Sequence, residues 1–151
     1  MNSDALKTTG LAHRRDIRRT RQSGWRWLTV AVLVHLVVSV VHGAAHSEAH
    51  VPLSRAANVF VFGVIVAGPL VGLALAVLSE RIGSWVIAIT MAGALVFGWA
   101  NHFLLAGPDR VWQVAERWRP MFTVTAALLA AIEGLASVLA IRIARGRKIA
   151  S

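Results

Sequence analysis

The sequence predicts an all-α integral membrane protein, with four transmembrane helices packed as an antiparallel bundle. Three observations predict this class. Of the 151 residues, 56% are hydrophobic and only 15% are charged. The apolar residues are concentrated in four long stretches, and lysine and arginine lie beside those stretches rather than within them. A helix rises about 1.5 Å per residue, so each stretch is long enough to cross the roughly 30 Å of hydrocarbon in a bilayer.

The four predicted spans cover residues about 27–47, 56–78, 84–106 and 120–142, within a transmembrane domain of residues 25–145. The first span reaches its length only if its helix continues past Gly43. The loop around Arg81 is very short, so we expect the second and third spans to be neighbours in a hairpin. Pro69 is expected to kink the second span near its middle.

Positive charge predicts the orientation, because lysine and arginine near span ends stay on the cytoplasmic side. Twelve of these residues flank one side of the predicted bundle and four flank the other. Both termini are therefore expected in the cytoplasm, with residues 1–24 as a mobile basic tail that can lie on anionic lipid and residues 146–151 as a short second tail. We expect the inner (cytoplasmic) membrane of a bacterium as the location. The small residues at 43–45 leave open that the first span is a cleaved signal peptide.

The outer loop between the third and fourth spans predicts a short amphipathic helix in the membrane interface. Pro108 and Asp109 are typical of a helix start. Apolar residues then recur at helical spacing, with charged residues between them. They are Val111, Trp112, Ala115 and Trp118.

Composition excludes several kinds of chemistry. The chain has no cysteine, which excludes an iron–sulfur cluster bound by cysteine and a covalently attached c-type haem. Glu133 is the only carboxylate within a predicted span, too few for a carboxylate-bridged di-iron centre. The net charge of +9 is explained by topology, so we expect no nucleic-acid partner. Motifs of soluble enzymes are absent, and the residues name no reaction.

Histidines are the remaining candidates for binding a metal or a cofactor. His35, His42, His46 and His50 are separated by seven, four and four residues, which places them within an arc of about 80° on one helix face. The predicted orientation puts His102 at the same outer level as His42 and His46. Imidazole nitrogens suit copper, zinc and iron. The sequence therefore predicts a metal site of His42, His46, His50 and His102, in which His42, His46 and His102 form the cofactor-binding set.

A second polar pair is predicted deeper in the bundle. His35 and Glu133 fall at about the same depth, in the first and fourth spans. Polar groups in hydrocarbon cost free energy when they are unpaired, so they should face the interior and meet. We expect a buried contact between His35 and Glu133.

Several functions remain open at this point. The first is a small protein that binds a transition metal (copper, zinc or iron) or a non-covalent haem, in electron transfer or metal handling. The second is a non-catalytic accessory subunit of a larger membrane complex, associated with a pigment that a histidine ligates or with another cofactor. The third is a proton- or ion-conducting element through His35 and Glu133. In a fourth, the histidines bind no ligand and only hold helices together. We expect the lipid bilayer, and a homo-oligomer or larger complex, as partners.

Overall fold

A computed structural model of the protein describes the backbone of residues 3–146 and the side chains of residues 22–146. Every regular element within this part of the chain is a helix. In chain order the elements are α1 (Ser3–Glu48), α2 (Arg55–Phe60), the π-helix η1 (Val61–Ala67), α3 (Gly68–Leu78), α4 (Glu80–Trp99), the π-helix η2 (Ala100–Leu104), the 3-10 turn η3 (Val111–Gln113) and α5 (Arg119–Ala144).

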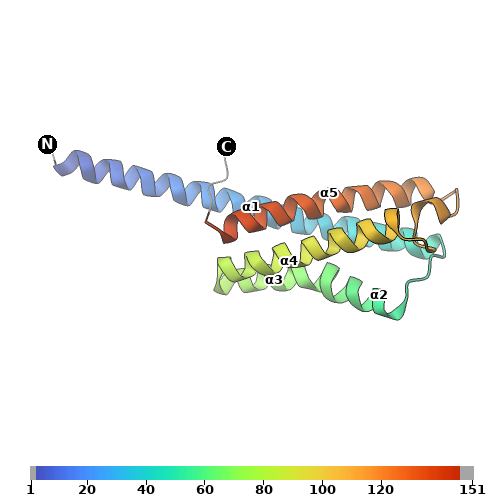
Figure 1. The fold of residues 1–151 in the computed structure, drawn as a ribbon. Helices are drawn as coiled ribbons and strands as arrows, with labels where there is room; N and C mark the ends of the chain where they lie inside the picture. The colour runs from blue at the N-terminus through green and yellow to red at the C-terminus, as the bar shows by residue number, and fades with distance from the viewer. Residues whose placement is uncertain (1–2, 147–151) are drawn as a thin grey trace.

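Four stretches of helix are long and apolar enough to cross a membrane, which confirms that part of the sequence prediction. They are Gln22–Glu48, Arg55–Leu78, Glu80–Leu104 and Arg119–Ala144, and below they are called the first to fourth spans. The spans lie side by side, and the amino-terminal part of α1 extends well beyond them (Figure 1).

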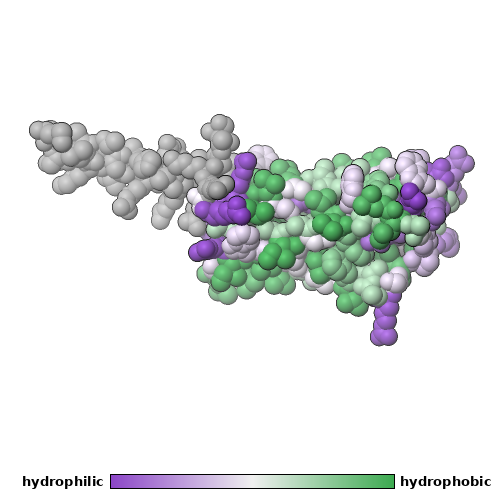
Figure 2. Space-filling view, viewed as in Figure 1, coloured by the Kyte–Doolittle hydropathy of each residue, from purple (hydrophilic) through white to green (hydrophobic). Residues whose placement is uncertain are grey.

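The surface of this helical body is largely apolar. Figure 2 shows hydrophobic residues along its length, with hydrophilic residues gathered toward its two ends. Val40 is 74% exposed and Val77 is 86% exposed. Apolar surface on this scale is unfavourable in water, whereas lipid chains cover it without cost.

The second and third spans are held together by close backbone contact. A Cβ atom added at Gly83 would lie 2.5 Å from both Gly72 O and Ala76 N, a distance that side chains do not reach. Ser79 joins the two helices, and its hydroxyl accepts a hydrogen bond from the backbone N–H of Ile82 at the start of α4. This hairpin therefore depends on small residues at the contact.

The interruption expected at Pro69 is a change of helix type. Proline has no N–H to donate to the preceding turn. Here Pro69 lies in the first turn of α3, directly after the π-helix η1. The wider turn of a π-helix accommodates the lost hydrogen bond, and α2 departs from the line of α3 (Figure 1).

Two clusters of buried apolar residues lie at the two ends of the body. The inner cluster includes Leu28, Val32, Ile87 and Met91, and all four side chains are fully buried. The outer cluster lies at the end where the loop between the third and fourth spans returns. It consists of Ala45, Val51, Val111, Val114 and Phe122.

The amphipathic helix predicted for residues 107–119 is reduced to the three-residue turn η3. Val111 and Val114 are about 1% exposed, so they are anchored in the outer cluster, whereas Trp112 is 67% exposed. The guanidinium of Arg119 donates to the Val114 carbonyl, which would otherwise accept a bond within a helix. The loop thus folds over the end of the helices instead of continuing as one.

Candidate metal centre

Two histidines of the site come from one continuous helix. The first span continues through Gly43 to Glu48, which is the condition that the sequence left open. His42 and His46 are therefore one turn apart on the same face. His102 approaches from η2 at the end of the third span. All three side chains are buried, and each offers a nitrogen within 4.8 Å of the others.

His50 does not join this cluster. The helix ends at Glu48, and His50 takes a positive φ of 54°. Its N–H donates to Ser47 O, and the N–H of Val51 donates to His46 O. This is a Schellman motif with His50 at the position that glycine usually takes. The side chain is exposed, and its Nδ1 is 3.0 Å from Glu48 O.

A hydroxyl fixes the tautomer of His42. The Thr125 hydroxyl has one proton, and its Oγ1 is 2.8 Å from the backbone carbonyl of Met121, which accepts that proton. The same Oγ1 is 2.7 Å from His42 Nδ1, so it accepts a hydrogen bond from Nδ1–H. The lone pair of His42 then lies on Nε2. This is the arrangement by which an outer partner orients a histidine ligand.

A carbonyl fixes His102 in the same way. His102 Nδ1 donates to the backbone carbonyl of Asp109 at 3.1 Å, with the Asp109 carboxylate 3.4 Å away. Both partners only accept, so the lone pair of His102 also lies on Nε2. His42 Nε2 and His102 Nε2 are 3.2 Å apart. Two lone pairs at this distance repel each other unless a proton or a metal ion lies between them.

Asp109 provides the negative charge beside the cluster. Its Oδ1 is 3.2 Å from His46 Nε2, close enough for an ion pair when the imidazole is protonated. His46 Nδ1 is buried and has no hydrogen-bond partner within the described part of the chain. Burial acts to raise the pKa of Asp109, but its hydrogen bond with His102 and the nearby imidazoles outweigh burial and lower that pKa below the usual value.

The separation of the nitrogens matches the needs of a single ion. Zinc binds imidazole nitrogen at about 2.0–2.1 Å in tetrahedral geometry, which places two ligand nitrogens roughly 3.3 Å apart. The 3.2 Å between the Nε2 atoms of His42 and His102 is close to this value. Phe122 packs against both rings and against His46, with centroid distances of 4.7 to 5.1 Å. A small ion held by these histidines would therefore have an apolar ring close beside it.

The same geometry gives no support to haem. A haem held by two histidines has one ligand on each face, so the macrocycle must pass between them. His42 and His102 instead stand edge to face, with ring centroids 4.9 Å apart.

The deeper pair lies where the sequence suggested. His35 Nε2 is 3.1 Å from Glu133 Oε1, between the first and fourth spans. The His35 side chain is fully buried, and Glu133 is 3% exposed. Because each is the other's partner, the contact meets the main requirement for placing polar groups inside an apolar bundle.

The sequence reasoning missed several residues of the site. Thr125 and Phe122 gave no signal, because a threonine or phenylalanine in an apolar span is ordinary. Asp109 was interpreted as a helix start. The available signal was the scarcity of acidic residues, since only seven occur in the chain and Asp109 follows His102 closely in the loop between the third and fourth spans.

Comparisons with protein-family models, with curated proteins and with solved structures gave no match for this chain.

Proposed function

We propose that the chain is a four-helix protein of the inner membrane that binds one transition-metal ion at the outer face of the bilayer. In this proposal the spans run antiparallel, both termini lie in the cytoplasm, and His42, His46 and His102 are the ligands. Twelve basic residues beside one end of the spans, against four beside the other, support this orientation.

The observation that carries the proposal is the pair of facing nitrogens. His42 Nε2 and His102 Nε2 are 3.2 Å apart, and the Nδ1 atom of each is occupied as a donor. The third histidine, His46, offers one nitrogen that lies within 4.8 Å of a nitrogen of each of the other two. One ion would be held by all three imidazoles, whereas a proton is shared by only two nitrogens.

The ligand set favours copper, zinc or iron over magnesium or calcium, which prefer oxygen. Three histidines leave a fourth position free, as in sites where a metal contacts a substrate or a passing ligand. All three side chains also line a cavity, from which a small ligand would reach an ion held between them. Electron transfer and metal handling are the roles consistent with such a site.

The test is a zinc titration of purified, chelator-treated protein in detergent, in competition with a chromophoric chelator. We expect one ion per chain. His42→Ala and His102→Ala should each weaken binding beyond the roughly 10- to 100-fold typical of losing an outer partner. His50→Gly is the matched control, because it removes an imidazole near the site and places the preferred residue at a positive φ.

Equal zinc affinity in the wild type, His42→Ala and His102→Ala would contradict the proposal. Circular dichroism and gel filtration of each variant would check that the helices and the monodispersity are retained.

A further inference from the structure

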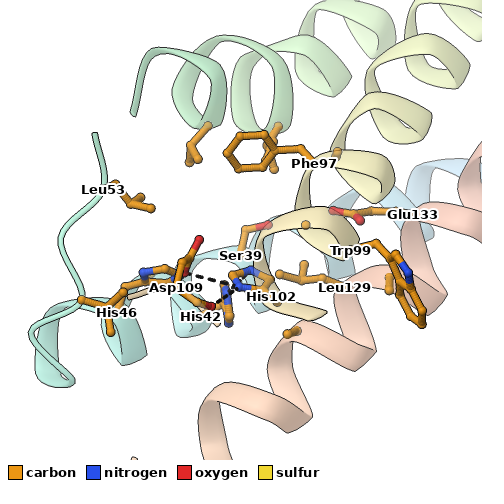
Figure 3. A pocket seen from close by; sticks show the side chains of 18 of the residues that line it. Ser39, His42, His46, Leu53, Phe97, Trp99, His102, Asp109, Leu129 and Glu133 are labelled. Atoms are coloured by element: carbon orange, nitrogen blue, oxygen red, sulfur yellow. Dashed lines mark hydrogen bonds and ion pairs between the residues drawn. The ribbon is translucent and has the colours of Figure 1, made fainter. Parts of the chain in front are cut away.

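The cavity beside the histidines has a volume of about 360 Å³. It lies between the outer half of the second span and the face made by the first, third and fourth spans, and it exists for two reasons. The second span changes course at η1, and Gly43 and Gly98 place no side chain in the space. Figure 3 shows Phe97 on one side of this space and His42, His102 and Ser39 on the other. Its volume falls in the range typical of small-molecule sites.

Polar groups lie at both ends of the cavity. His42, His46 and His102 line the outer end, and Glu133 lines the inner end. Thr125, the partner of His42, and Glu133 are eight residues apart on α5, which is roughly 12 Å along the helix. Ser39 lies between them on α1. Its Oγ is buried and makes no hydrogen bond within the described part of the chain.

The inner end of the cavity is closed. Below Glu133 the spans pack through the fully buried side chains of Leu28, Val32, Ile87 and Met91. A molecule that entered would therefore stop beside Ser39 and Glu133. This arrangement is typical of a binding site with one entrance.

The walls between the polar ends are apolar and aromatic. They include Phe62, Phe97 and Trp99. Phe62 is 67% exposed and Trp99 is 51% exposed, so these residues reach from the cavity to the apolar outer surface of the helices. The entrance is thus open to a molecule dissolved in lipid.

We propose that this cavity binds the head group of a lipid-soluble quinone or quinol. Such a ring is planar and apolar on its faces, which suits a cavity whose walls include Phe62 and Phe97. It carries oxygens at opposite edges, which suits hydrogen-bonding groups at the two ends. An alkyl chain would leave the Ser39 hydroxyl and its neighbours unpaired, and an anionic solute would lose its hydration and meet the Asp109 carboxylate. The proposal does not depend on a bound metal.

The test measures binding of radiolabelled decylubiquinone to the full chain in detergent, by equilibrium dialysis against matched empty micelles. We expect saturable binding of one molecule per chain. Ala130 lines the cavity, so Ala130→Phe fills it and should weaken binding at least tenfold. Ala127→Phe, one turn away on an exposed face of the same helix, adds the same ring outside the cavity and should leave binding unchanged.

Ser39→Ala should weaken binding by about two- to tenfold, the usual effect of one neutral hydrogen bond. The matched control is Ser84→Ala. Ser84 is a buried serine outside the cavity, and its hydroxyl already donates to Glu80 O. Each binding measurement would be made with chelator and again with zinc. Decylubiquinone binding in the presence of chelator should be lost in Ala130→Phe, weakened in Ser39→Ala and unchanged in the two controls. That result would support the quinone site even if zinc does not bind.

Two outcomes would overturn the proposal. One is decylubiquinone uptake that does not saturate, or that Ala130→Phe and Ala127→Phe change equally, because it would show partition into the micelle. The other is full displacement by decanol at the same concentration, because it would show an apolar slot without recognition of the ring oxygens.

Discussion

At the scale of single residues, the candidate centre is defined less by the histidines than by what holds their outer nitrogens. Thr125 accepts from His42 Nδ1 at 2.7 Å, and Asp109 accepts from His102 Nδ1 at 3.1 Å. These contacts remove the rotational freedom of both rings before any ion arrives. Binding then costs less ordering entropy, which is the advantage of a preorganised site.

Thr125 offers the sharpest test of this idea. Thr125→Val keeps the shape but removes the acceptor for His42 Nδ1–H, so zinc affinity should fall roughly 10- to 100-fold. Thr125→Ser keeps the hydroxyl and should retain most of the affinity. Competition titrations of the two variants would measure this. Similar affinities in Val and Ser would show that the hydroxyl does not orient His42.

At the scale of elements, the sequence predicted the spanning helices well, because the length of each apolar stretch can be read directly from the order of its residues. Continuation of α1 past Gly43 was harder to judge, since a glycine there is compatible with a helix or an end. The helix does continue past Gly43 and ends at Glu48. Two residues later, His50 takes the left-handed conformation. This backbone conformation removes His50 from the face that holds His42 and His46. Helical spacing in the sequence does not show where a helix ends, so it could not predict this.

The loop between the third and fourth spans shows a second limit. Val111 and Val114 are spaced as on a helix face, but three residues apart also suits a single tight turn. Two contacts favour the turn over a helix. Val111 and Val114 are buried against Phe122, and the Arg119 guanidinium donates to the Val114 carbonyl. Both are tertiary contacts. Asp109 could be recognised as part of the centre only after this loop was placed beside His102.

The hairpin of the second and third spans makes a prediction at this scale. Gly83→Ala places a Cβ 2.5 Å from backbone atoms of the neighbouring helix, and backbone cannot move aside as a side chain can. We expect the free energy of unfolding to fall by about 2 kcal/mol or more. Gly63→Ala is the control, because nothing lies within 4 Å of its added Cβ. Thermal unfolding in detergent would compare them, and equal stabilities would contradict this packing.

At the scale of the whole molecule, the two ends of the helical body differ in kind. The inner end is filled by apolar side chains. The outer half holds the histidines, Asp109 and the cavity. A body that is filled at one end and holds a cavity at the other is suited to binding an ion or a small molecule at the end that holds the cavity. The deep contact of His35 with Glu133 lies at the boundary between the two halves.

The proposed orientation is tested by labelling, which the absence of natural cysteine makes simple. Gln113 and Arg145 are exposed at opposite ends of the helical body. In intact spheroplasts, Gln113→Cys should react with a membrane-impermeant maleimide, and Arg145→Cys should react only after the cells are broken. The reverse pattern would place the histidine cluster in the cytoplasm.

The central claim is that the three histidines bind a transition metal, and elemental analysis of the native protein tests it most directly. The protein would be purified in mild detergent without chelator and without a metal-affinity tag. We predict close to one atom of copper, zinc or iron per chain, and loss of that atom in His102→Ala. A wild-type protein that contains none of these metals, or a His102→Ala variant with unchanged metal content, would contradict the account.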